Sequence, residues 1–118
     1  MHLIKFVLKT MVFIIPYSLS LSAEYGFTYI NGNTLLQRIN GLDVENTFAL
    51  GYVVGAYDAY AQEQTWDNQK HYICMPQSVE TGQMLDIVKK YLNDNPSIRH
   101  FAAGGSVLTA LSISFPCN

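Results

Sequence analysis

The chain has 118 residues, with 7 Lys and Arg, 9 Asp and Glu, and two cysteines. Its net charge of −2 provides no electrostatic reason to bind nucleic acid or an anionic membrane. The sequence contains no repeat, low-complexity tract or block of like charge. We therefore expect one small domain whose partners are neutral or basic.

The first 23 residues have the parts of a secretion signal. Lys5 and Lys9 form a positive start, residues 11–17 an apolar run, and residues 20–23 (Ser-Leu-Ser-Ala) a cleavage region of small side chains. Cleavage after Ser22 and cleavage after Ala23 fit equally well. The apolar run is shorter than the roughly 20 residues that span a bilayer, which disfavours a retained membrane anchor.

We therefore expect a signal peptide over residues 1–23 and a single domain over residues 24–118. Without Lys5 and Lys9, 5 basic residues face 9 acidic ones, a net charge of −4. The expected location is the periplasm, with no membrane contact after signal removal. In that oxidising compartment Cys74 and Cys117 are expected to form a disulfide. This disulfide would reduce the chain entropy of the unfolded state and so contribute about 4 kcal/mol to the free energy of unfolding.

The remaining pattern predicts an all-α fold, a small domain resembling a four-helix bundle with one disulfide. Asn33 is expected to cap a first helix over residues 34–39, which ends at Asn40-Gly41. A second helix is expected from about residue 43 to residue 64, because apolar side chains recur there at helical spacing. Those side chains are Phe48, Tyr52, Ala56 and Ala59.

Two further helices are expected in the second half of the chain. Ser78 or Thr81 should cap the third helix, which reaches residue 93. Asn95-Pro96 should start the fourth helix, over about residues 97–113. Their expected core side chains are Met84, Ile87, Val88, Tyr91, Leu92, Ile98, Phe101, Leu108 and Leu111.

Gly51 and Gly55 stand four residues apart inside the second predicted helix. Each costs about 1 kcal/mol relative to Ala in a helix interior. In a membrane this spacing would favour dimerisation, but in a small bundle it predicts a neighbouring helix packed close to the backbone. Asp58 falls on the same helix face, so we expect it to be partly buried and hydrogen-bonded to backbone amides, with a contact at the rim of a binding surface as the alternative.

Residues 65–72 combine polar and aromatic side chains without helical periodicity, which predicts a loop. The only tryptophan, Trp66, falls in this loop, and exposed Trp and Tyr side chains are enriched among those that dominate protein interfaces. The alternative is that the Trp66 ring folds back over the core. We predict that the segment binds a partner through Gln64, Trp66, Asp67, Asn68, Gln69, Lys70, His71 and Tyr72.

The chain also holds the residue types of a cysteine hydrolase, since Cys74 could be served by His71, His100 and Asp58. A disulfide would remove the thiolate that this chemistry requires. His71 and His100 are far apart in sequence and form no metal-ligand pair at helical spacing. We interpret His100 as a surface or capping residue, and we predict no enzyme activity, no cofactor and no metal site.

Five segments occur in a recognisable order: Gly51–Ala59, Cys74-Met75-Pro76, residues 82–92, Pro96 with Arg99-His100, and Phe115-Pro116-Cys117. Together they resemble the Rap/Tai family of type VI secretion amidase immunity proteins, over about residues 29–117. One departure is that many relatives carry a further cysteine pair around the positions of Arg38 and Ala49. In this chain the bond between Cys74 and Cys117 is therefore the only candidate disulfide.

The resemblance implies a small, mainly helical periplasmic protein that protects its own cell or its siblings. Its partner would be a cognate peptidoglycan amidase effector whose active-site cleft it occludes. Relatives are often dimeric, so the resemblance also implies a homodimer. The alternative function is that of a small periplasmic helical chaperone or stress protein without a toxin partner, against which a charged content of only 14% argues mildly.

Overall fold

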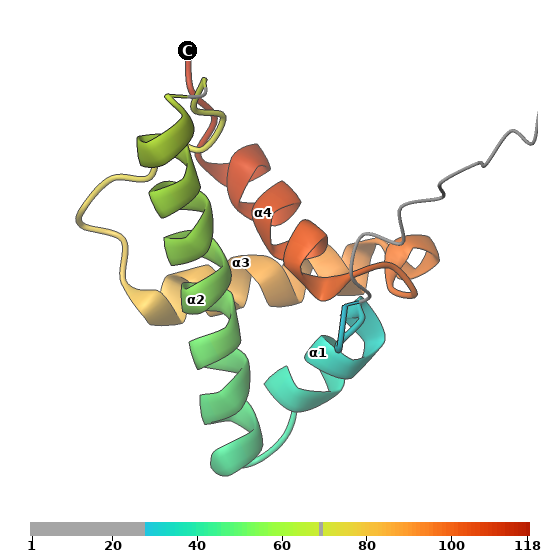
Figure 1. Cartoon of the computed structure of the whole chain (residues 1–118). Coiled ribbons are helices and arrows are strands. Elements are labelled where there is room, and N and C mark those ends of the chain that lie inside the picture. The colour runs from blue at the N-terminus through green and yellow to red at the C-terminus, as the bar shows by residue number, and fades with distance from the viewer. Residues whose placement is uncertain (1–27, 69) are drawn as a thin grey trace, which may run out of the picture.

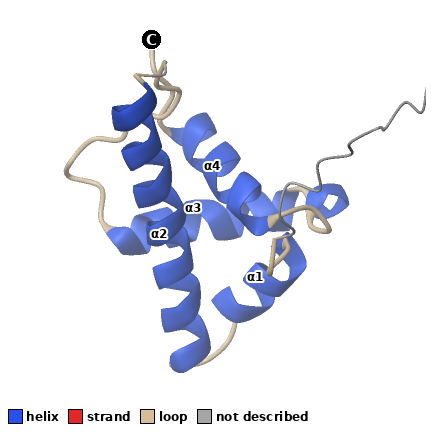
Figure 2. Cartoon of the chain, viewed as in Figure 1, coloured by secondary structure: helices blue, strands red, loops and turns tan. Residues whose placement is uncertain are grey.

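A computed structural model describes residues 28–68 and 70–118 of the chain. In chain order its elements are α1 (Gly32–Ile39), α2 (Val44–Asp67), α3 (Thr81–Asp94), the 3-10 helix η1 (Pro96–Ile98) and α4 (Ala103–Ser114) (Figure 1). The described residues contain helices and no strand (Figure 2). The predicted all-α fold with one disulfide is confirmed. The signal peptide predicted over residues 1–23 lies outside the described residues.

The four α-helices all contact one another around a single core. In Figure 1, α2 stands upright, α3 crosses behind its middle, α1 lies beside its lower half and α4 beside its upper half. None of the helices described combines the length and the apolar character needed to cross a bilayer. The buried apolar side chains are Leu35, Leu36, Ile39, Ala49, Val53, Tyr60, Ile73, Met84, Leu85, Val88, Leu92, Ala103, Val107, Ala110 and Leu111.

The first helix begins earlier than its predicted start, because Asn31 rather than Asn33 caps it. The Asn31 side chain accepts a hydrogen bond from the Thr34 N–H at 2.9 Å. The backbone N–H groups of Gly32 and Asn33 donate to the carbonyls of Phe101 and Arg99, at 3.0 and 2.9 Å. These bonds join the start of α1 to the turn before α4.

The third helix begins at Thr81, and its cap is Glu80, not Ser78 or Thr81. Glu80 and Gln83 form a reciprocal capping box, in which the Gln83 side chain accepts a hydrogen bond from the Glu80 N–H at 2.7 Å. Such a pair satisfies two backbone donors, whereas a single serine or threonine cap satisfies one.

The fourth predicted helix is divided, because the chain forms η1 and a turn before α4 starts at Ala103. The Arg99 guanidinium donates to the carbonyls of Leu92 and Asn93, at 2.6 and 3.2 Å, and so ties this turn to the end of α3. The prediction that Phe101 is buried is wrong, since its side chain is 59% exposed.

The second helix extends three residues beyond its predicted end and ends at Asp67. The Thr65 hydroxyl bonds back to the Ala61 carbonyl at 3.0 Å, and Asn68 adopts a left-handed conformation with φ 50°. Asn tolerates that conformation better than most residues, which makes it a common helix terminator. The loop predicted to start at Thr65 is therefore wrong for its first three residues.

Gly51 and Gly55 do not mark a close helix contact. A Cβ atom added to either glycine would meet no atom within 4 Å, and both residues are exposed. The predictions of tight packing there and of a partly buried Asp58 are wrong, since Asp58 is exposed too. The reason is that α2 packs on the core through Ala49, Val53 and Tyr60, which point away from the glycines.

Candidate interaction surface

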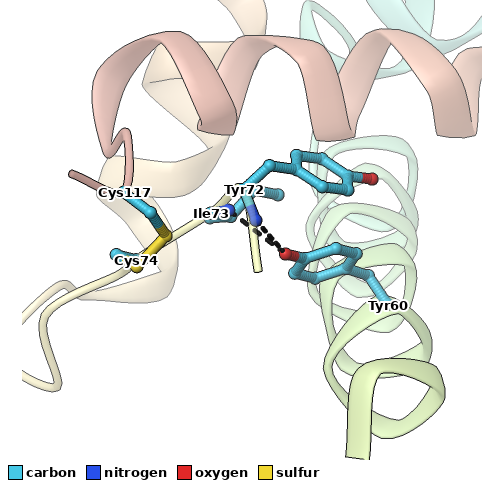
Figure 3. Close-up of a disulfide and its surroundings, with 5 residues drawn as sticks. All are labelled: Tyr60, Tyr72, Ile73, Cys74 and Cys117. Atoms are coloured by element: carbon cyan, nitrogen blue, oxygen red, sulfur yellow. Dashed lines mark hydrogen bonds between the residues drawn. A yellow bond between two sulfur atoms is a disulfide. The ribbon is translucent and has the colours of Figure 1, made fainter. Parts of the chain in front are cut away.

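The segment after α2 is fastened to that helix by one buried tyrosine. The Tyr60 hydroxyl accepts hydrogen bonds from the backbone N–H groups of Tyr72 and Ile73, at 3.0 and 3.1 Å (Figure 3). Tyr60 is only 4% exposed and Ile73 only 3%, so these bonds are shielded from water. The chain is therefore fastened to α2 at Tyr72 and Ile73.

The predicted disulfide between Cys74 and Cys117 is present, with the two Cα atoms 5.0 Å apart (Figure 3). The Cys74 N–H also donates to the Phe115 carbonyl at 2.8 Å, and Ile73 forms an isolated antiparallel bridge with Pro116. The C-terminal residues thus hold this segment from its other side. Because neither cysteine is free, the Cys74 nucleophile of the hydrolase alternative is absent.

Tyr72 places its ring against that of Tyr60 while keeping 48% of its surface exposed. The ring centroids are 4.7 Å apart and the planes meet edge to face at 62°. Burial raises the pKa of the Tyr72 phenol, and the neighbouring Tyr60 and Glu63 raise it further. Tyr72 therefore presents a neutral hydroxyl that a partner can use as a donor or an acceptor.

Trp66 lies in the last turn of α2, and 77% of its surface is exposed. The alternative in which its ring covers the core is wrong. The polar residues Asp67, Asn68, Lys70 and His71 are exposed around the same end of the helix. This arrangement gives an exposed apolar ring surrounded by polar side chains, as in the centre and rim of many protein interfaces.

One of the residues predicted to bind a partner does not join this surface. Gln64 is 8% exposed, because it lies on the inner side of α2. Gln69 lies outside the described residues. The exposed members gather where α2 ends and the C-terminal residues Phe115–Asn118 pass by (Figure 1).

An apolar groove between α2 and α4 was missed by sequence reasoning. Its volume is about 470 Å³. The Tyr52 phenol lies at its edge, where burial raises its pKa and a hydrogen bond from the Gly104 backbone partly opposes that rise. Its sequence signal is the pair Gly51 and Gly55, whose spacing predicts a closely packed helix but which border an open groove. The groove is lined by Gly51, Tyr52, Gly55, Ala56, Ala59, Tyr60, Glu63, Gly104 and Leu108.

The opposite end of α2 also exposes apolar side chains, with Leu42 at 85%, Val44 at 79% and Phe48 at 44%. The Arg38 guanidinium lies 4.5 Å from the centroid of the Phe48 ring and pairs with Glu45 at 2.6 Å. The Phe48 ring, 44% exposed, thus lies against the charged end of Arg38 of α1.

Within residues 28–68 and 70–118, no three side chains of the metal-binding types lie together. His100 is an exposed surface residue, and its ring lies beside that of Phe101 at a tilt of 37°, with 4.1 Å between the ring centroids. The structure thus defines a small disulfide-bonded helical protein whose most prominent features are exposed apolar surfaces along its longest helix.

The comparison with protein families then identifies the family. The model of the Rap1a immunity proteins matches residues 31–117, which is most of the chain. The protein therefore belongs to the family of Rap1a immunity proteins, in agreement with the resemblance found in the sequence. A search of the curated proteins and a search of the solved structures each gave no match.

Proposed function

We propose that this protein is a periplasmic immunity protein that binds a type VI secretion peptidoglycan amidase and occludes its active site. Membership of the Rap1a immunity proteins supports a role in neutralising an effector. We further propose that the target is an amidase, that the protein is located in the periplasm and that it has no enzyme activity. These proposals rest on the segments that resemble amidase immunity proteins and on the secretion signal read in residues 1–23.

The observation that carries the proposed mechanism is the exposed Trp66 beside a doubly fastened segment. Trp66 is 77% exposed, and the segment after its helix is fastened by a disulfide and by hydrogen bonds to Tyr60, so the backbone at Tyr72–Cys74 needs little further ordering on binding. Trp66 would enter the amidase cleft, with Tyr72 beside it. Asp67, Asn68, Lys70 and His71 would form the polar rim. Inhibition is then steric, because substrate and Trp66 compete for the same cleft.

We also propose that two copies form a homodimer, as the resemblance implies. Exposed apolar side chains away from Trp66, such as Phe101 and Ile113 at 59% and 66%, are available for that contact. Light scattering of the purified protein after size-exclusion chromatography measures its mass directly. A monomer at all concentrations up to about 1 mM would contradict this part of the proposal.

The function is tested with the purified amidase effector of the producing organism and isolated peptidoglycan as substrate. The protein lacking residues 1–23 should abolish release of peptide stems at a one-to-one ratio. The double change Trp66→Ala with Tyr72→Ala should weaken binding by more than 1 kcal/mol, because aromatic anchors carry much of an interface's energy. Its thermal unfolding is measured in parallel to establish that the fold is retained.

Phe101→Ala is the matched control, because it removes an exposed aromatic ring on another part of the surface. This variant should inhibit like the unchanged protein. If the unchanged protein neither binds nor inhibits any amidase effector of its organism, the proposed function is wrong. If the unchanged protein inhibits the amidase and the variant with Trp66→Ala and Tyr72→Ala binds it equally well, the contact surface lies elsewhere on the molecule.

A further inference from the structure

An apolar strip, interrupted by the exposed Gln62, runs along the outer side of α2 from its first residue to its last turn. Residues three, four, seven and eight apart share one face of a helix, and this spacing relates all members of the strip. The larger side chains stand at its two ends, Val44 and Phe48 at one and Trp66 at the other. The strip, called here the outer face of α2, consists of Val44, Phe48, Gly51, Gly55, Ala59 and Trp66, all of them exposed.

The middle of the outer face is hollow. Gly51 and Gly55 have no atom within 4 Å of an added Cβ, and beside them lies the groove of about 470 Å³. Gly104 and Leu108 of α4 form its far wall, and Tyr52 and Glu63 flank it. A surface with aromatic rings at both ends and a hollow between them is complementary in shape to a convex apolar ridge, such as a helix of another protein.

The charges beside this groove have one sign. Helix α2 contains Glu45, Asp58, Glu63 and Asp67 and no Lys or Arg. Glu45 is paired with Arg38 of α1, whereas Glu63 lines the groove and Asp58 is exposed beside the glycines. Two copies of the chain joined through this face would bring these carboxylates together, and like-charge juxtaposition at an interface costs several kcal/mol. A partner with Lys or Arg beside its apolar ridge would instead be complementary.

We propose that the outer face of α2 is a second docking surface, which receives an apolar ridge flanked by Lys or Arg side chains on the amidase effector. This inference rests on the proposed function and extends it from the end of α2 to the whole helix. With 24 residues, α2 is about 36 Å long at 1.5 Å per residue. That length lets one effector contact Trp66 and the groove together and bury an interface of ordinary size.

The proposed fit between the groove and an apolar ridge of the effector is tested by filling the groove without disturbing the core. Gly55→Leu places a side chain in open space, so its urea midpoint should not fall below that of the unchanged protein. Its affinity for the amidase effector, measured by calorimetry, should fall at least tenfold. The matched control is Gly82→Leu in the first turn of α3, another exposed glycine with no atom within 4 Å of an added Cβ, and its affinity should not change.

The proposed attraction between the carboxylates of α2 and basic side chains of the effector is tested by reversing two of these charges. Asp58→Lys combined with Glu63→Lys should weaken amidase binding at least tenfold and flatten its dependence on salt, because attraction between exposed charges is screened by ions. Asp86→Lys, which reverses an exposed charge on α3, is the control and should change both quantities little.

The outcomes separate this inference from the proposed function. If the unchanged protein does not bind the amidase, both are wrong. If it binds, and the Gly55 and charge-reversal variants bind equally well, the second docking surface is wrong while the proposed function stands. If Gly55→Leu converts a dimer to a monomer and leaves amidase affinity unchanged, the occupant is a second copy and the inference is overturned.

Discussion

The inner and outer faces of α2 are both apolar, but they differ in what covers them. The inner face places Ala49, Val53 and Tyr60 at 0–4% exposure against the other helices. The outer face leaves Phe48 and Trp66 at 44% and 77% and opens a hollow at Gly51 and Gly55. A helix that is apolar on both sides is normally buried on both. On this long helix of a small domain, the second, exposed face is better explained by binding than by folding.

The largest expected effect on stability comes from removing the disulfide, which restrains the segment bound by Tyr60 of the inner face. Replacing Cys74 and Cys117 with Ala together should lower the free energy of unfolding by roughly 4 kcal/mol, because the bond closes a loop with a sequence separation of 43. Urea unfolding of the double variant and the unchanged protein measures this difference. A loss below about 1 kcal/mol would mean that the hydrogen bonds to Tyr60 and Phe115 hold the segment without the disulfide.

A smaller loss is expected from Tyr60→Phe, which keeps the ring but removes the acceptor of two backbone donors. The Ile73 N–H would then be buried without a partner, which costs about 1–3 kcal/mol. Hydrogen exchange of the Tyr72 and Ile73 amides should quicken with the loss of stability. Tyr57→Phe, whose hydroxyl accepts no described hydrogen bond from this segment, is the control and should leave both amides protected.

Two glycine-to-alanine changes compare the open outer face of α2, at Gly55, with a packed position at the start of α1, Gly32. Gly55→Ala should raise the free energy of unfolding by about 0.5–1 kcal/mol, since Ala favours the helix and meets no neighbour. Gly32→Ala should lower it by about 1–3 kcal/mol, because its Cβ would lie 3.0 Å from the Arg99 Cα and carbonyl oxygen. Equal effects of the two changes in urea unfolding would contradict the assignment of Gly55 to an open face.

Much of this fold follows from sequence patterns that are local. The four helical segments and the single disulfide follow from periodicity and cysteine count. In α3 the same periodicity predicts the buried Met84, Val88 and Leu92 but misses Leu85, and Ile87 and Tyr91 are only half-buried. The caps at Asn31 and Glu80 do not, because several adjacent polar residues could each have served. The division of the fourth helix depends on Arg99 reaching the carbonyls of Leu92 and Asn93, a contact between elements that no local pattern contains.

The candidate site was predictable in composition more than in geometry. An exposed Trp66 among polar neighbours followed from its surroundings in sequence, whereas its place on a helix did not. Gly51 and Gly55 were assigned to the wrong side of α2, since glycine carries no polarity that indicates which face is covered. Only the positions of Ala49, Val53 and Tyr60 in the core decide that the glycines face outward.

The smallest expected effect lies at the boundary between the two faces, where Tyr52 is half-buried and its hydroxyl meets the Gly104 backbone. Burial raises the pKa of this phenol above its ordinary value of 10.0, so the folded state resists forming the phenolate. As the pH rises past about 10, the unfolded chain releases this proton first, and the free energy of unfolding should fall.

Tyr52→Phe removes this titration, so its unfolding free energy should decline less steeply than that of the unchanged protein between about pH 9 and 11. Lysines and the other tyrosines titrate in the same range in both proteins, so their contributions cancel in the difference. Urea midpoints measured across that range give the two slopes. Parallel slopes would show that Tyr52 is solvated like the outer face, which would move the boundary between the faces inward toward α4.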